Sequence, residues 1–187
     1  MDFLVLSRAA AHAAGTDDDA LNETHWSYMD RFAGSMIARG PTLAADRKTW
    51  TGSVHVLGLP DAGAARRFVA DEPYNRAGLY KEHSIWVFEN LLGRTMWEFA
   101  GPQATEPRFL VIAEGSLEPM ALAELPAPLR DRLIVYGTLR SAQNGTAAGV
   151  AFAVQAPTRA AVDALAHEAV EPRARVQVYD WEFGGRR

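Results

Sequence analysis

The first half of the chain carries a histidine and three carboxylates whose types suit proton transfer. His25 lies near the start of an expected helix, where the positive end of the helix dipole would favour the neutral, base-competent imidazole. A neutral imidazole can take a proton from a phenol, an enol or an activated carbon. A carboxylate from Asp46, Asp71 or Glu72 would fix its tautomer and stabilise the imidazolium that forms. The alternative is a structural role, in which the His25 ring only hydrogen-bonds a neighbouring loop.

Three further residues are predicted to contact a substrate. Trp50 follows Asp46 at an expected strand end, and Tyr74 follows Glu72 in the segment after the second expected helix. His55 lies on an expected strand, so a structural role in the sheet competes with a role in binding. Tryptophans usually pack in cores, and the position of Trp50 close to Asp46 is what favours a ligand contact for it.

The sequence offers no recognisable thiol, metal or phosphate site. It contains no cysteine, which removes thiolate zinc ligands and cysteine nucleophiles. Its histidines show no His-x-His or His-Glu-x-x-His spacing, and no glycine-rich segment opens a helix as phosphate loops do. We therefore expect no native metal and no bound cofactor.

Composition and charge are those of an ordinary globular chain. Of the 187 residues, 48% are hydrophobic and 22% are charged, which excludes disordered and fibrous classes. The net charge of −4 argues against binding to nucleic acid. No apolar run approaches the length of a membrane span, and the first residues lack the pattern of a secretory signal. We therefore expect a cytoplasmic protein that binds neither membrane nor nucleic acid.

Hydrophobic periodicity predicts strands and helices in the order of a split β-α-β fold. In the first half the expected strands and helices are, in chain order, strand 3–7, helix 22–38, a strand within 43–51, strand 52–59, helix 62–70 and strand 84–88. Gly40 and Pro41 are expected to end the first helix, and Asp46 to lie near the end of the second strand. This order predicts a ferredoxin-like α+β domain with both helices on one face of an antiparallel sheet.

The second half repeats the first at an offset of 97 residues. The shift superimposes residues that punctuate the expected elements: Gly40, Gly52 and Pro60 fall on Gly137, Gly149 and Pro157. We predict a fold of the α+β class in which two tandem ferredoxin-like (βαββαβ) repeats form an intrachain pseudo-dimeric α/β barrel. Residues 1–95 form the repeat that carries the site, residues 96–107 a packed connector, and residues 108–187 a degenerate, structural repeat.

Five short motifs follow one another in the first half. They are His25, Gly40-Pro41, Asp46, the strand that starts at Gly52, and Glu72-Pro73-Tyr74 followed by Ala77-Gly78-Leu79-Tyr80. In order and spacing they resemble the YciI-like (YCII-related) family of the dimeric α/β-barrel superfamily, over about residues 3–90. The family usually carries Asp-Pro-Tyr or Asp-Pro-Phe where this chain has Glu72-Pro73-Tyr74, so the carboxylate is kept but reaches one methylene further.

The resemblance implies a dimeric α/β-barrel fold and a small-molecule site centred on a histidine and a carboxylate. A few relatives act on small ring compounds, as in the dehydrochlorination of chlorinated hydroxyquinols. More distant members of the superfamily isomerise lactones or oxidise small aromatics. For this chain the resemblance supports a catalytic role for His25 with Asp46 or Glu72 as its partner.

The second half has lost the residues that could do chemistry. At the offset of 97, His25, Asp46 and His55 fall on Leu122, Gln143 and Phe152. The second repeat is therefore expected to be a structural partner that replaces the second subunit of a homodimer. One functional pocket per chain is expected, in the first repeat.

These features together predict a cofactor-independent enzyme that uses a His/carboxylate pair on a small organic, ring-shaped substrate. The reaction class would be elimination, isomerisation or hydrolysis. The rival prediction is a non-catalytic module that binds a small ligand or another protein in the same cleft. The expected partner is a small molecule, and whether the chain also forms a homodimer stays open.

Overall fold

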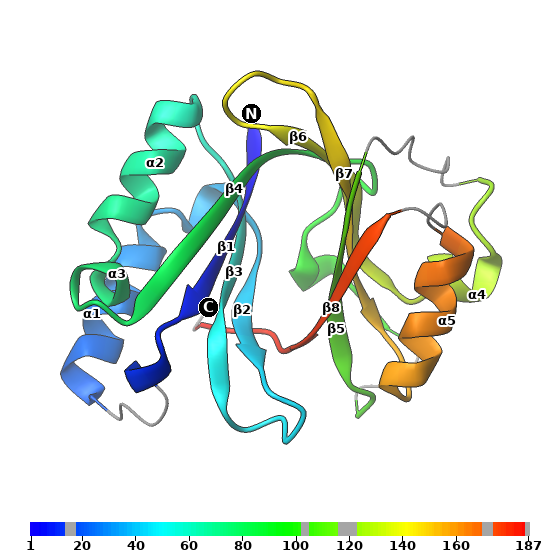
Figure 1. Cartoon of the computed structure of the whole chain (residues 1–187), viewed down its shortest axis with the longest axis horizontal. Coiled ribbons are helices and arrows are strands. Elements are labelled where there is room, and N and C mark those ends of the chain that lie inside the picture. Colours follow the sequence, from blue (N-terminus) through cyan, green and yellow to red (C-terminus); the bar gives the residue numbers. More distant parts are fainter. Residues whose placement is uncertain (14–17, 102–104, 116–122, 170–173, 186–187) are drawn as a thin grey trace.

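Eight strands form one closed antiparallel barrel in the computed structural model of the chain, with helices packed on its outer sides (Figure 1). The structure describes residues 1–13, 18–101, 105–115, 123–169 and 174–185, and the backbone alone for 167–169. Around the barrel the strand order is β1-β3-β2-β8-β5-β7-β6-β4. The described residues form five α-helices, so the fold is mixed α+β, as predicted. None of these helices is both long enough and apolar enough to cross a membrane.

The first half contributes four strands and three helices. They are β1 (Asp2–Ala9), α1 (Asp19–Asp30), β2 (Met36–Leu43), β3 (Trp50–Gly58), α2 (Ala62–Asp71), α3 (Pro73–Arg76) and β4 (Tyr80–Asn90). Asp18 and Asp61 start α1 and α2, because their carboxylates accept hydrogen bonds from the backbone N–H groups of Leu21 and Ala64. Figure 1 shows the three helices together on one flank of the barrel.

The second half contributes four strands and, among its described residues, two helices. They are β5 (Arg108–Glu114), α4 (Ala127–Arg130), β6 (Leu133–Ser141), β7 (Ala147–Gln155), α5 (Arg159–Ala169) and β8 (Arg175–Trp181). The elements β6, β7 and α5 each start 97 residues after β2, β3 and α2, so the offset seen in the sequence recurs in the element bounds. The segment between the halves packs down: Met96 is buried, and its sulfur accepts a hydrogen bond from the N–H of Arg39.

Two glycines allow the halves to join edge to edge. The barrel closes where β2 pairs with β8 and where β4 pairs with β6. A Cβ on Gly40 would lie 1.8 Å from the carbonyl oxygen of Glu182, and a Cβ on Gly137 would lie 2.1 Å from that of Glu89. Both junctions therefore need a residue without a side chain, at matching positions of β2 and β6.

The prediction of a helix over residues 22–38 is wrong at its end. The helix α1 stops at Asp30, and β2 takes up Met36–Leu43, with Gly40 inside the strand. The local residues favour a helix, but β2 pairs with a strand on each side, and this long-range pairing outweighs local propensity. The segment predicted as a second strand, 43–51, is mostly the turn between β2 and β3, and Asp46 lies in that turn.

Alternation along the strands sends apolar side chains to opposite faces of the sheet. Leu4 and Leu6 of β1 belong to a buried cluster that both halves share, together with Leu110 of β5. Phe3 and Val5 face the other way, into a cluster under α1 and α2. The face of the sheet that carries these helices is also the face on which the candidate site lies.

Candidate functional site

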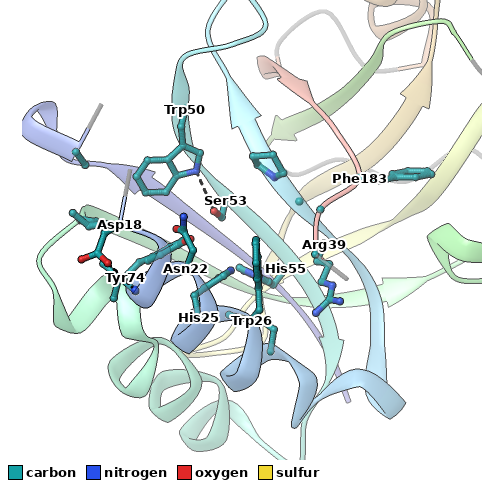
Figure 2. Close-up of a pocket in the computed structure, with 18 of the residues that line it drawn as sticks. Asp18, Asn22, His25, Trp26, Arg39, Trp50, Ser53, His55, Tyr74 and Phe183 are labelled. Carbon is teal, nitrogen blue, oxygen red and sulfur yellow. Dashed lines mark hydrogen bonds between the residues drawn. The ribbon is translucent and has the colours of Figure 1, made fainter. Parts of the chain in front are cut away.

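A cavity of about 810 Å³ lies beside α1, β2 and β3. Its walls come from α1, β2, the turn between β2 and β3, β3 itself, the segment after α2, and the chain that follows β8 (Figure 2). A cavity of this volume can enclose a small organic molecule. The polar and aromatic residues that line it include Asn22, His25, Arg39, Trp50, His55 and Tyr74. The carboxylates of Glu72, Asp46 and Asp71 are not among the lining residues.

A short hydrogen bond joins His25, which lines the cavity, to the buried carboxylate of Glu72. Nδ1 of His25 lies 2.5 Å from Oε1 of Glu72, and the two side chains are 12% and 4% exposed. The other carboxylate oxygen of Glu72 accepts a hydrogen bond of 2.8 Å from the backbone N–H of Asn75. Because a carboxylate only accepts, Nδ1 carries a proton, and Nε2 holds a lone pair when the ring is neutral. Glu72 therefore keeps the ring in the tautomer that a general base needs.

Aromatic rings fix the plane of His25 and form part of the wall. Tyr74 stacks on His25 with ring centroids 4.1 Å apart and planes inclined by 5°. Trp50 contacts Tyr74 edge-on at 5.7 Å, and the hydroxyl of Tyr74 donates a 2.6 Å hydrogen bond to the side chain of Asn22. Burial, with the charge of Glu72 as the smaller cause, raises the pKa of Tyr74 to about 12, so its hydroxyl stays protonated. Trp50 and Tyr74, both predicted to contact a substrate, thus lie at the cavity beside His25.

His55 and Arg39 form a directly opposed pair on β3 and β2, so their side chains lie on the same face of the sheet. They are 3% and 5% exposed, and the His55 ring lies 6.2 Å from the His25 ring (Figure 2). Burial lowers the pKa of His55 to about 3, with His25 and Arg39 as smaller causes. His55 is therefore a neutral hydrogen-bonding group near neutral pH, and Arg39 is a permanent cation. Sequence reasoning missed Arg39, because its pairing with His55 becomes visible only when β2 is recognised as a strand.

The other two candidate carboxylates lie elsewhere. Asp46 is exposed in the turn between β2 and β3, where its oxygens accept hydrogen bonds from Thr49 and Lys48, and these bonds lower its pKa to about 2. Asp71 forms an ion pair of 2.5 Å with Arg76. The structure thus brings Glu72 to His25, and the expectation that Asp46 would orient the ring is not met, because that carboxylate is engaged within its own turn.

His25 lies in the middle of α1 and not in its first turn. The sequence predicts that the helix starts at residue 22, whereas α1 starts at Asp19, after the capping side chain of Asp18. A helix dipole acts mainly within the first turn, so the contribution expected from it does not apply. The carboxylate of Glu72, through its hydrogen bond to Nδ1, fixes the tautomer of the ring instead.

The remaining histidines have other surroundings. His83 in β4 does not line the cavity and hydrogen-bonds the side chains of Ser7 and Asn75 at 2.9 and 2.8 Å, and burial lowers its pKa. His12 is exposed in the 3₁₀ turn at 11–13, and the side chain of His167 lies outside the described residues. In the described part of the chain no three His, Asp or Glu residues are grouped so as to hold a metal ion.

The second half also contributes to the cavity wall. Phe183, Gly184 and Gly185 follow β8 and line the cavity next to Gly40. A Cβ on Gly184 would lie 2.6 Å from the Cα of Gly40, so two glycines let the backbones pass in contact. The N–H of Gly184 donates a hydrogen bond of 3.1 Å to the carbonyl of Arg39. The second half therefore also lines the cavity, in addition to the structural role expected for it. Gly40 and Gly184 are the residues in the sequence that allow this close passage.

The matching face of the second half is apolar. At the offset of 97, Arg39 and His55 correspond to Tyr136 and Phe152, which are again directly opposed, now on β6 and β7. Tyr136 and Phe152 are 2% and 1% exposed and lie in a hydrophobic cluster with residues of α5. The same scaffold position thus holds a cation and a histidine in one half and two aromatic rings in the other.

The positions in the second half that correspond to Asp46 and His25 are not among the described residues of this apolar face. Gln143, which replaces Asp46, is exposed in the turn between β6 and β7. Leu122, which replaces His25, lies outside the described residues. The expected asymmetry between the halves therefore has structural support at Tyr136 and Phe152 alone.

Comparison with known proteins gives one family and several similar folds. Residues 1–89 match the YCII-related domain family. No curated protein matches the chain. Among solved structures, a mutant chlorite dismutase from Candidatus Nitrospira defluvii is 8% identical with a TM-score of 0.57, and the match covers 97% of this chain and 91% of that one. A candidate chlorite dismutase is 12% identical with a TM-score of 0.51, covering 97% of this chain and 95% of that one.

A third similar structure matches only part of the chain. It is 5-chloro-2-hydroxyhydroquinone dehydrochlorinase from Burkholderia phenoliruptrix AC1100, solved with 2,5-dihydroxybenzoquinone. It is 23% identical with a TM-score of 0.38, and the match covers 46% of this chain and 90% of that one. The two likenesses that span nearly the whole chain are 12% and 8% identical and concern the fold alone.

Proposed function

Because residues 1–89 belong to the YCII-related domain family, we propose that the protein is an enzyme that moves protons on a small, ring-shaped organic substrate held in the cavity. The observation that carries the proposal is the 2.5 Å hydrogen bond between Nδ1 of His25 and Oε1 of Glu72, both largely buried. His25 is the general acid/base, and Glu72 orients it. The reaction class is elimination, isomerisation or hydrolysis, with no cofactor required.

The neutral form of His25 starts the reaction. The lone pair on Nε2 takes a proton from an acidic O–H or C–H bond of the substrate, while the Nδ1–H group stays bonded to Glu72. The imidazolium that forms lies against a buried carboxylate, where the attraction between opposite charges is stronger than in water. Glu72 therefore lowers the energy of the charged state through which the reaction passes.

The electron pair left on the substrate determines the product. In an elimination, the pair moves into the ring and a leaving group such as chloride departs with its bonding electrons. The substrate loses H⁺ and Cl⁻, and the imidazolium then releases the proton to solvent. In an isomerisation, the imidazolium returns the proton to a different carbon. In a hydrolysis, His25 takes the proton from the attacking water and gives it to the leaving group. Each course ends with neutral His25.

Trp50, Tyr74 and His55 provide the binding surface in this proposal. Trp50 and Tyr74 present aromatic groups against which a ring can pack. His55, neutral and 6.2 Å from the His25 ring, can hydrogen-bond a second oxygen of the same substrate. Asp46 has a supporting role, because its hydrogen bonds order the turn that holds Thr49 at the cavity.

The proposed origin of the fold is a duplication within one chain. Two copies of a ferredoxin-like unit, residues 1–95 and 108–187 joined by 96–107, would make the barrel a pseudo-dimer. The strand orders β4-β1-β3-β2 and β8-β5-β7-β6, the offset of 97 in three elements, and the matching glycines Gly40 and Gly137 at the two junctions support this origin. The first unit keeps the acid–base pair.

Turnover of defined probes tests the enzymatic function. The wild-type protein is incubated with a chlorinated hydroxyquinol and with a small unsaturated lactone, and chloride release and lactone isomerisation are measured. His25→Gln should lower the rate about 100-fold or more, since loss of a general acid/base typically costs that much. His12→Gln, at an exposed histidine outside the cavity, should leave the rate unchanged.

Two results would count against this function. A wild-type rate in His25→Gln would remove the acid–base role of the histidine. Binding of the probes in the cavity without turnover by the wild-type protein would favour the rival function, a non-catalytic module that binds a small ligand.

A further inference from the structure

Arg39 brings a permanent positive charge to the cavity wall, with its side chain buried. Burial of a guanidinium has a large desolvation cost, which contacts with polar or charged groups offset. The fold itself does not require the charge, because Tyr136 fills the matching position of β6 and is opposed to Phe152 as Arg39 is opposed to His55. Arg39 lines the cavity, so a ligand held there can meet this charge.

The charges around the cavity favour an anion next to Arg39. Lys48 adds a second cation to the described lining residues. The one carboxylate among those residues, Asp18, is exposed and engaged in capping α1. The positive charge of Arg39 is felt at the cavity wall, since it contributes to the lowered pKa of His55. A ligand with an anionic oxygen on this side of the cavity would meet a favourable potential.

His25, His55 and Arg39 follow one another along the wall. The His55 ring lies 6.2 Å from the His25 ring, and His55 is directly opposed to Arg39 in the sheet register. Figure 2 shows His55 between the other two. We propose that Arg39 binds an anionic oxygen of the substrate, so that the cavity takes a small aromatic acid or phenolate whose reacting group lies at His25. This inference rests on the proposed function, because the ligand is the substrate of that site.

The guanidinium would serve both binding and chemistry. Its planar donor groups match a carboxylate, with two parallel hydrogen bonds, and they also suit an ionised phenol. When His25 removes a proton, negative charge develops on the substrate, and a fixed cation in a water-poor cavity stabilises it. Arg39 would thus contact the substrate at the end of the cavity away from Glu72.

Binding of two probes of equal shape and different charge tests the proposal. Calorimetry is used to compare 4-hydroxybenzoate with 4-hydroxybenzamide, and the wild-type protein should bind the acid about tenfold more tightly or better. Binding of 4-nitrophenol, measured at pH values below and above its own pKa, tests a phenolate as the source of the anionic oxygen. Its affinity should increase as the phenol ionises. Equal affinity of the wild-type protein for acid and amide, with no tightening for nitrophenolate, would overturn the inference and leave the proton-transfer function standing.

Variants assign the preference to one residue. Arg39→Gln and Arg39→Tyr, the latter copying Tyr136, should bind acid and amide with similar affinity, and Arg39→Lys should keep part of the preference. Arg67→Gln, at an exposed cation on α2, should keep all of it. Thermal unfolding checks that each variant is folded. If the first two variants do not fold, the comparison of Arg39→Lys with the wild-type protein decides.

The remaining outcomes are also decisive. A preference for the acid that persists in Arg39→Gln and Arg39→Tyr would assign the anion to another cation and refute the role of Arg39. Failure of the wild-type protein to bind either probe would refute the substrate class proposed here, whereas the proton-transfer function would still be judged by turnover in His25→Gln.

Discussion

Replacing Glu72 with glutamine should leave the protein folded and change the tautomer of His25. Glu72 accepts two hydrogen bonds, from Nδ1 of His25 at 2.5 Å and from the N–H of Asn75 at 2.8 Å. Glutamine has one carbonyl oxygen, which can keep the bond to Asn75, and an NH₂ group, which would point at His25. The ring would respond by moving its proton to Nε2, so that Nδ1 accepts a hydrogen bond from the amide.

The effect on activity should exceed the effect on stability. One charge-assisted hydrogen bond, worth about 1.5–3 kcal/mol, is replaced by a neutral one worth about 1 kcal/mol, so the free energy of unfolding should fall by about 0.5–2 kcal/mol. The rate should fall about 10²–10⁴-fold, because a protonated Nε2 has no lone pair for the substrate proton. A structural role for the pair would instead lower stability without this selective loss of rate.

Nitrogen-15 NMR of the histidine side chains reads the tautomer, because protonated and unprotonated ring nitrogens differ in chemical shift. The neutral His25 ring should carry its proton on Nδ1 in the wild-type protein and on Nε2 in Glu72→Gln. Asp71→Asn is the matched control, since Asp71 is the adjacent carboxylate and pairs with Arg76 instead. The same tautomer and a retained rate in Glu72→Gln would refute the orienting role of Glu72.

Two further predictions concern the scaffold of the site. Gly40→Ala should lower the free energy of unfolding by about 3 kcal/mol, because its Cβ would lie 1.8 Å from the carbonyl oxygen of Glu182. Gly34→Ala, with nothing within 4 Å, should change it by less than about 0.5 kcal/mol, and urea unfolding measures both. The pKa of His55 is about 3 in the folded protein, whereas its ordinary value is 6.5. Between these pH values the unfolded chain binds more protons than the folded one. The free energy of unfolding should therefore fall as the pH drops from 6.5 toward 3. Urea unfolding at several pH values should show a flatter fall in His55→Phe than in His12→Gln.

Elements defined by their own residues could be predicted from the sequence. A continuous apolar run, Phe3 to Leu6, indicated β1, alternation around Val54 and Val56 indicated β3, and Pro60-Asp61 marked the start of α2. The offset of 97 also followed from local signals, since Gly40 and Gly137 mark corresponding positions in the two halves. Each of these signals depends on residues close together in the chain, so no long-range contact had to be known.

Elements that depend on distant partners could not be predicted in the same way. The segment Met36–Leu43 is a strand because β3 and β8 pair with it, and β8 lies more than a hundred residues away in the sequence. Gly40 was therefore interpreted as a helix stop, although its lack of a side chain serves the contact with Glu182. The error in β2 also hid Arg39, whose side chain reaches the cavity only from a strand.

The sequence could predict the histidine of the site but not the carboxylate that contacts it. His25 was identified by its type, and the structure places it at a cavity. Spacing along the chain could not choose between Asp46, Asp71 and Glu72, because the choice depends on where the turn after β2 and the start of α3 lie in space. Of the three, Glu72 is the one whose carboxylate contacts the His25 ring. The same carboxylate caps the start of α3 by accepting a hydrogen bond from the N–H of Asn75.

Incorporation of solvent deuterium into a small unsaturated lactone tests the central claim most directly, because it reports proton transfer whether or not a product forms. In D₂O the wild-type protein should exchange the acidic C–H of the lactone, seen as loss of its proton NMR signal, and His25→Gln should not exceed the rate in buffer. Exchange at the same rate in both proteins, or binding of the lactone to the wild-type protein with no exchange above buffer, would contradict the assignment of His25 and Glu72 as an acid–base pair.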